Sequence, residues 1–479
     1  MKAKWKLAIL VICSLLIGAT GGHVGSDLFL KWNAPKEDVE EHRSTNQEQV
    51  DLVKVAQAYE LIRKHYIEEV DDEKLISGAI QGMVETLKDP YSVYMDEETA
   101  KQFSQSLDSS FEGIGTEIGV EDEKIIIVSP YKDSPAEKAG LKPKDEIVSV
   151  DGNSVKGLNV QEVSVKIRGE KGTKVKLEIK RPGVANLLTF DIKRDQIPVE
   201  TVFSSIKEEA GKKIGYIEIT SFSKQTSTDF AKELKALEKK EMEGLIIDVR
   251  GNPGGLLPSV EEIVSEVVTN EKPYLQIESR EGEQTKYYTK LEEQKPYDIV
   301  VLIDEGSASA SEILAASLQE AGGYALIGEK TFGKGTVQQA VQMNDGSNIK
   351  LTLYKWLTPN GNWIHKKGIE PTVSVKQPSI FHTQPLNIET ILKRDMTNEQ
   401  VEHAQEMLRG LGYETGRNDG YFDLKTEVAV KAFQNSEDLE ITGKIDVKTA
   451  AALEKNVIEE IKNEDNDLQL RTALRYLTK

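Results

Sequence analysis

Short apolar runs alternate with helical stretches between residues 214 and 375, and this alternation limits the possible folds more than any other feature of the chain. The apolar runs lie at 214–219, 245–249 and 299–303, with helical patterns at 228–240 and 259–268. Continuous apolar runs bounded by turns are typical of strands buried on both faces, and intervening helices favour a parallel sheet. We therefore expect an α/β domain over residues 195–377.

The other segments differ from this pattern, and a chain of 479 residues is long enough for about three or four domains. We expect a multidomain α+β protein, and a weak repeat that begins at Gly420 and again at Gly443 favours a small helical unit near the end. The expected order is a signal peptide or membrane anchor at 1–22, a linker at 23–48, a helical module at 49–108, a β-rich domain at 109–194, the α/β domain at 195–377, a linker at 378–395, an α-helical domain at 396–457 and a docking helix at 458–479.

The first residues have the layout of an export signal, with Lys2, Lys4 and Lys6 followed by an apolar, uncharged run at 7–22. The run is slightly short for a spanning helix and has only a poor cleavage site, so anchored and released forms both fit, with anchoring preferred. Cys13, the single cysteine, lies in this run. The chain therefore offers no intrachain disulfide, cysteine nucleophile or cysteine metal site, and we expect no metal or other cofactor.

The net charge excludes one broad class of partner. The chain has 80 acidic and 61 basic residues, for a formal net charge of −19. Proteins that bind nucleic acid through its phosphates need a positive surface. We therefore expect no nucleic-acid partner.

A cluster of small residues at 304–312 follows an expected strand and precedes a helical pattern. A serine at such a turn can expose its hydroxyl while the next backbone N–H faces the charge that develops on a substrate carbonyl. Ser309 is our candidate nucleophile, although Ser307, Ser309 and Ser311 can each serve instead as an ordinary N-cap.

A serine nucleophile needs a base, and the chain offers two candidates near the α/β domain. Of six histidines only His365 is placed to compete, and Lys334 lies between two glycines after an apolar run. Burial disfavours the ammonium form, and enzymes lower the pKa of such lysines to about 7 to 8. A solvated surface charge is the ordinary alternative for any single lysine.

Three blocks together resemble the carboxyl-terminal processing protease family: Arg-Gly-Asn-Pro-Gly-Gly at 250–255, the serine turn at 304–312, and Gly-Lys-Gly-Thr-Val-Gln at 333–338. The resemblance implies a ClpP- or crotonase-like core. It also implies a catalytic dyad of Ser309 and Lys334, assisted by Gln338. Oxyanion-hole amides would come from Gly254 or Gly255 together with Ala310. His365 and Lys366 depart from the family pattern, and we expect His365 to be a surface or turn residue rather than a base.

The β-rich domain resembles a PDZ domain in three blocks, at 111–115, 134–141 and 145–152. Its carboxylate-binding loop would consist of Phe111, Glu112, Gly113, Ile114 and Gly115. Such a loop offers backbone N–H groups to a terminal carboxylate while the peptide adds as a strand. Arg168, at the end of the expected helix 160–167, is a gating candidate; an exposed structural role is the alternative.

The last domain resembles a peptidoglycan-binding-like domain, which implies contact with cell wall or only a dimer contact. The whole domain set is similar to family members of endospore-forming bacteria. That similarity implies sporulation signalling in the space between two membranes, protein substrates with free C-termini, a membrane-tethered regulator and a homodimer formed through the helical module. Two other functions remain open: a catalytically silent PDZ scaffold bound to cell wall, and a crotonase-like acyl-thioester enzyme.

Overall fold

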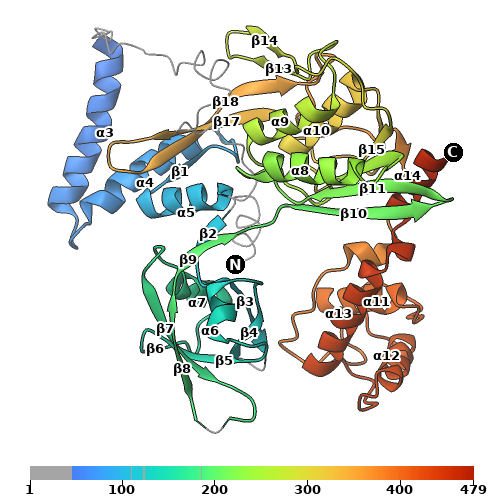
Figure 1. Ribbon diagram of the computed structural model, residues 1–479. Helices are drawn as coiled ribbons and strands as arrows, with labels where there is room; N and C mark the ends of the chain where they lie inside the picture. The colour runs from blue at the N-terminus through green and yellow to red at the C-terminus, as the bar shows by residue number, and fades with distance from the viewer. Residues whose placement is uncertain (1–45, 109, 122–123, 185) are drawn as a thin grey trace.

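The computed structural model describes residues 46–108, 110–121, 124–184 and 186–479 (Figure 1). The expected segment 1–22, Cys13 and nearly all of the expected linker 23–48 lie outside these residues. Within the described ranges, no helix is both long and apolar enough to cross a membrane.

A six-stranded sheet forms the centre of the α/β domain, and all of its strand pairs are parallel except the first. The alternation in the sequence predicted three of its strands, at 214–219, 245–249 and 299–303, and helices at 228–240 and 259–268, but not the order of the strands in the sheet. In sheet order, the strands are β10 (Val202–Glu209), β11 (Lys212–Ile219), β12 (Gly244–Asp248), β15 (Asp298–Ile303), β16 (Ala325–Gly328) and β19 (Val373–Ser374); the helices are α8 (Thr226–Glu238), α9 (Leu257–Val267) and α10 (Ala310–Ala316).

Both faces of this sheet are buried, because successive side chains along a strand point to opposite faces. Leu245 and Ile247 of β12 belong to the cluster that also contains apolar side chains of α8, α9 and α10, whereas Ile246 between them belongs to a second cluster. The second cluster contains Leu470 and Leu477 of α14 (Leu468–Thr478), so the last helix of the chain covers the opposite face.

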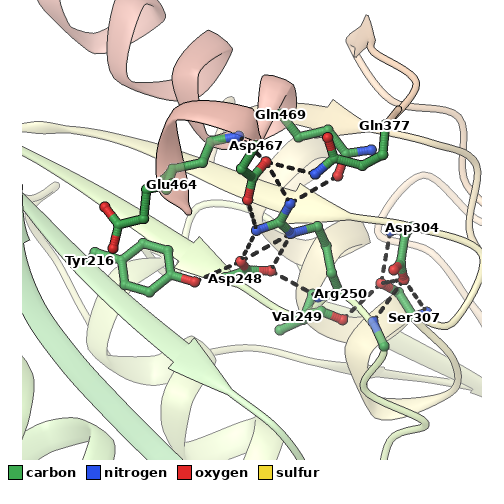
Figure 2. A network of polar contacts seen from close by, with 12 residues as sticks. Tyr216, Asp248, Val249, Arg250, Asp304, Ser307, Gln377, Glu464, Asp467 and Gln469 are labelled. Carbon is green, nitrogen blue, oxygen red and sulfur yellow. Dashed lines mark hydrogen bonds and ion pairs between the residues drawn. The ribbon is translucent and has the colours of Figure 1, made fainter. Parts of the chain in front are cut away.

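An ionic network fixes α14 at the end of β12 (Figure 2). Both side-chain oxygens of Asp467, the N-cap of α14, accept hydrogen bonds from Arg250, at 3.0 and 2.8 Å. Arg250 also pairs with Asp248 of β12 at 2.6 Å, and Gln377 and Gln469 complete the network. The arginine that begins the glycine-rich turn is therefore bonded to the C-terminal helix.

A second sheet joins the N-terminal module to the α/β domain (Figure 1). The register of its first strand pair places Val93 opposite Lys350. The helical module is thus continuous with the core through β1, a pairing that the sequence patterns did not predict. The elements are α3 (Asn46–His65), α4 (Asp72–Glu85), β1 (Val93–Met95), α5 (Glu97–Leu107), β13 (Leu275–Glu278), β14 (Gln284–Tyr287), β17 (Thr336–Gln342) and β18 (Asn348–Leu357).

The chain enters and leaves the β-rich domain through a two-stranded antiparallel ribbon, in which Phe111 pairs with Ile197. Its own sheet packs around buried Ile127, Ile147 and Leu177. The ribbon consists of β2 (Ser110–Gly113) and β9 (Asp195–Pro198); the domain contains β3 (Thr116–Glu121), β4 (Lys124–Pro130), α6 (Pro135–Ala139), β5 (Glu146–Val150), β6 (Asn153–Ser154), α7 (Val160–Ile167), β7 (Lys174–Lys180) and β8 (Leu188–Lys193).

The C-terminal helices α11 (Glu399–Gly410), α12 (Leu424–Ser436) and α13 (Val447–Lys462) show why the sequence repeats. Gly420 N donates to Gln405 Oε1 and Gly443 N donates to Gln434 Oε1, at 3.1 and 2.9 Å. Each glycine is followed by an aspartate that caps the next helix. Ile380 and Leu392 are buried in the same cluster, so the stretch 378–395, expected as a linker, packs as part of this unit.

Candidate active site

The turn between β15 and α10 carries the candidate nucleophile. Ser309 is the N-cap of α10, is fully buried, and has a φ of 57°, a strained conformation for a residue with a side chain. Ser307 Oγ donates to Val249 O and Ser311 Oγ to Asn252 O, both at 2.8 Å. Ser309 Oγ has no hydrogen-bond partner among the described residues. Of the three serines, Ser309 therefore has the hydroxyl that is not committed to the fold.

Lys334 is fully buried, so the ordinary alternative of a solvated surface charge does not apply to it. Its carbonyl accepts a hydrogen bond from Trp356 Nε1 at 2.8 Å, and its Nζ lies 4.8 Å from the centroid of the Tyr91 ring. Tyr91 follows α4 in the helical module, and sequence reasoning did not identify it. Because Ser309 Oγ has no hydrogen-bond partner in the part of the chain that the structure describes, the candidate base and nucleophile are not hydrogen-bonded to each other.

A buried carboxylate connects the two candidate residues. Glu312 accepts hydrogen bonds from the backbone N of Ser309 and of Lys334, each at 2.8 Å, from Gly333 N at 2.7 Å and from Thr331 Oγ1 at 2.6 Å. Burial raises the pKa of the Glu312 carboxyl, and these hydrogen bonds oppose the rise. One side chain thus holds both turns in a fixed relation.

Sequence reasoning missed Glu312, although a signal was present. A glutamate three residues after a serine at a helix start is the pattern of a capping box, in which the carboxylate bonds back to the N-cap N–H. The second role of Glu312, its bonds to Gly333 and Lys334, depends on a contact across the fold. The spacing in the sequence contains no sign of that contact.

Gln338 lies on β17, where the pairing with β18 shifts register. Its side chain is fully buried, and its Nε2 donates to Thr336 Oγ1 at 2.9 Å and to Thr352 Oγ1 at 3.1 Å. Its Oε1 has no hydrogen-bond partner within the described part of the chain. The amide is therefore oriented by two threonines and keeps one buried acceptor uncommitted.

The glycine turn after β12 packs directly against the serine turn. A Cβ added to Gly254, which has a φ of 105°, would lie 2.9 Å from Ser309 Cβ and 3.0 Å from Ala310 N. Gly254 N donates to Asn252 Oδ1 at 2.8 Å, so this amide is used within the turn. Gly255 N is therefore a better candidate than Gly254 N to act together with Ala310 N as a donor to the oxyanion.

His365 lies in a turn, as expected, but it also forms part of the site wall. Its ring stacks on Trp363 with centroids 5.2 Å apart and meets the Tyr91 ring edge-on at 6.3 Å. Burial lowers the pKa of His365, the charge of Lys366 lowers it further, and Asp89 opposes both. This half-buried ring thus contacts both Trp363 and Tyr91.

The β-rich domain has a groove of about 200 Å³ between its first loop and α7. Of the predicted loop, Phe111, Gly113, Ile114 and Gly115 line the groove, whereas Glu112 does not. The Arg168 guanidinium carbon lies 4.9 Å from the centroid of the Phe111 ring and also lines the groove. The candidate loop and the candidate gating residue therefore meet at one pocket.

Comparisons with known proteins match each of these units. The model of peptidase family S41 matches residues 213–375, and the activating protease CtpB N-terminal domain matches 15–99. A PDZ domain matches 126–181, and a putative peptidoglycan binding domain matches 397–453. The carboxy-terminal processing protease CtpB of Bacillus subtilis (strain 168) is 55% identical over 473 residues, which are 98% of this chain and 98% of that protein. The chain belongs to peptidase family S41.

Two further similarities accompany this assignment. The S41 peptidase is 46% identical over 427 residues to the carboxy-terminal processing protease CtpA of Bacillus subtilis (strain 168), with 89% of this chain and 90% of that protein covered. The solved structure of a photosystem II D1 C-terminal processing protease matches with 26% identity, a TM-score of 0.42, and coverage of 69% of this chain and 94% of that chain. The protein is a serine-type C-terminal processing peptidase.

Proposed function

We propose that this S41 peptidase is an exported endopeptidase in which Ser309 is the nucleophile and Lys334 the general base. The observation that carries the proposal is that a buried serine hydroxyl on a strained turn has no hydrogen-bond partner among the described residues, while a fully buried lysine bonds through its backbone N to the same carboxylate as the serine. Glu312 fixes both turns through hydrogen bonds to their backbone N–H groups. A water-excluded serine and lysine joined in this way suit acyl transfer.

The chemical step follows from these groups. Neutral Lys334 takes the proton of Ser309 Oγ as the oxygen attacks the scissile carbonyl, and the lysine then gives that proton to the leaving amine. Water hydrolyses the resulting ester by the reverse proton path. The amides of Ala310 and of Gly255 or Gly254 stabilise the oxyanion, and Gln338 Oε1 is the acceptor that orients the lysine.

We propose that substrates are selected through their free C-termini by the groove of the β-rich domain. The groove joins the loop 111–115 to α7, and glycines at positions 113 and 115 allow a peptide to approach the backbone closely. Arg168 is the gating candidate, since its guanidinium lies over Phe111 in that loop. When a peptide binds, the Arg168 guanidinium can leave the Phe111 ring and pair with the terminal carboxylate of the peptide.

The wider setting is also a proposal. The residues of segment 1–22 support export with anchoring or release, and the similarity to CtpB supports a role in sporulation signalling between two membranes, with a membrane-tethered regulator as partner. We also propose that the protein forms a homodimer through the helical module and that its last domain contacts cell wall. The parallel core would have a ClpP- or crotonase-like topology. The alternative is a catalytically silent PDZ scaffold on cell wall.

The test uses the full chain and an unfolded protein substrate with an apolar C-terminus. Ser309→Ala and Lys334→Ala should each reduce cleavage by at least about 10³-fold while circular dichroism stays unchanged. Lys330→Ala is the matched control, because Lys330 lies in the same turn but is half exposed and pairs with Glu370 on the surface. Full activity of Lys334→Ala would refute the dyad, and a wild-type chain that binds C-terminal peptides without cleaving them would favour the scaffold.

A further inference from the structure

The contact between Lys334 and Tyr91 brings a residue of the helical module into the proposed dyad. Tyr91 is 8% exposed and Lys334 is 0% exposed, and the lysine Nζ lies 4.8 Å from the centroid of the tyrosine ring. Tyr91 comes from the turn between α4 and β1, more than 200 residues before Lys334 in the sequence. The ring therefore reaches the proposed base from another domain.

Hydrogen bonds hold this tyrosine in place. Asp89 accepts from Tyr91 N at 3.1 Å and from Ser92 Oγ at 2.7 Å. Ser92 Oγ in turn accepts from Thr352 N of β18 at 3.1 Å. Thr352 Oγ1 also accepts from Gln338 Nε2 at 3.1 Å. The turn that carries Tyr91 is thus bonded to the same strand residue that orients Gln338.

The aromatic contact favours one protonation form of the lysine. The face of an aromatic ring attracts an ammonium group but not a neutral amine, and the attraction is stronger where water is excluded. A general base has to be neutral when it takes a proton. Ser309 Oγ and Gln338 Oε1 are without hydrogen-bond partners among the described residues, so Lys334 Nζ is bonded to neither. The contact with Tyr91 accordingly stabilises the ammonium form of a lysine that is not hydrogen-bonded to Ser309 Oγ.

We propose that Tyr91 is a positioning residue that holds Lys334 in a charged resting state, outside hydrogen-bond contact with Ser309, so that the helical module sets how much of the enzyme has a competent base. This inference rests on the proposed dyad. Charged or titratable groups around the pair include Glu312, which accepts a hydrogen bond from the backbone N of Lys334, and His365, which meets the Tyr91 ring edge-on. Lys366 and Asp89 are also near, and their charges act on the pKa of His365 in opposite directions.

The experiment compares pH–rate profiles of the full-length enzyme. Tyr91→Leu removes the ring face and should move the midpoint of the rising limb of kcat about one pH unit lower, which is about a tenfold gain on the acid side, with KM unchanged. Tyr91→Phe keeps the ring and should restore the wild-type midpoint. Tyr94→Leu is the matched control, because Tyr94 lies three residues further on, in β1, and its hydroxyl contacts Ser77.

Two outcomes would overturn the proposal: an unshifted midpoint in Tyr91→Leu, or an equal shift in Tyr94→Leu. If Tyr91→Leu does not fold, phenylalanines with one to three ring fluorines at position 91 keep the shape and weaken the ring face stepwise. The midpoint should then fall with each fluorine, and a constant midpoint would refute the role.

A second measurement separates this inference from the dyad itself. In a Ser309→Ala background, the pH dependence of Lys334 acetylation by acetic anhydride, followed by mass spectrometry, needs no catalysis. Removal of the ring should make Lys334 reactive at lower pH in this background too. If Ser309→Ala remains an active protease, the proposed dyad is refuted. The acetylation result in that case still tests whether the Tyr91 ring favours the charged form of Lys334.

Discussion

Replacement of Asp467 by Asn tests how firmly the last helix is attached to the core. Asp467 caps α14 by accepting from Leu470 N at 2.8 Å and pairs with Arg250 through both of its oxygens. An asparagine can keep the cap. It removes the negative charge that faces a largely buried guanidinium.

The free-energy cost of Asp467→Asn depends on the contacts that Arg250 keeps in the variant. Breaking a buried ion pair costs about 3–5 kcal/mol when a charge is left unpaired. Arg250 still pairs with Asp248 at 2.6 Å in the variant, so we expect only the loss of charge-assisted hydrogen bonds, about 1.5–3 kcal/mol. Local opening of α14 should become roughly 10- to 100-fold more frequent, at about 1.4 kcal/mol per factor of ten.

Hydrogen–deuterium exchange of the α14 amides measures this opening directly. The matched control is Asp465→Asn, an exposed aspartate two residues earlier. Burial alone would raise the pKa of Asp467, but the hydrogen bonds and charge of Arg250 outweigh it and leave the pKa below its usual value. The ionised pair therefore stabilises the fold above about pH 4 and is lost only as the pH falls through the lowered pKa. Unchanged α14 exchange at pH 7, or an equal change in Asp465→Asn, would refute the reasoning.

Two further substitutions test the site. Glu312→Gln places an amide where the carboxylate accepts from Ser309, Gly333 and Lys334, so at least one buried N–H loses its acceptor. We expect a loss of about 1–3 kcal/mol in stability and at least a tenfold lower kcat; wild-type values for both in denaturation and steady-state assays would contradict the bridging role. Gly254→Ala adds a Cβ 2.8 Å from Ala308 O and should lower kcat about 100-fold, whereas Gly251→Ala, with nothing within 4 Å of its added Cβ, should change it little. Equal kcat values for the two glycine variants would show that the turn does not position Ser309.

The sequence predicted the elements better than the contacts between them. The apolar runs at 245–249 and 299–303 became β12 and β15, because period and length reflect local packing demands. The pairing of β1 with β18 joins residues more than 250 positions apart, and three-residue β1 has no strand pattern of its own. Ser309 and Lys334 stood out through turn chemistry and family spacing. Tyr91 did not, because its role comes from a contact that no local pattern encodes.

The position of α14 makes the peptidase core depend on residues that follow the helical domain in the chain. Ile246 and Val300 of the central sheet share one apolar cluster with Leu470 and Leu477 of α14, which begins more than 90 residues after β19. This face of the sheet is therefore covered only after the chain has passed through α11, α12 and α13. A core cut from the chain at residue 377 would expose these apolar side chains to water, so the core and the helical domain cannot be separated at that point without loss of buried apolar surface.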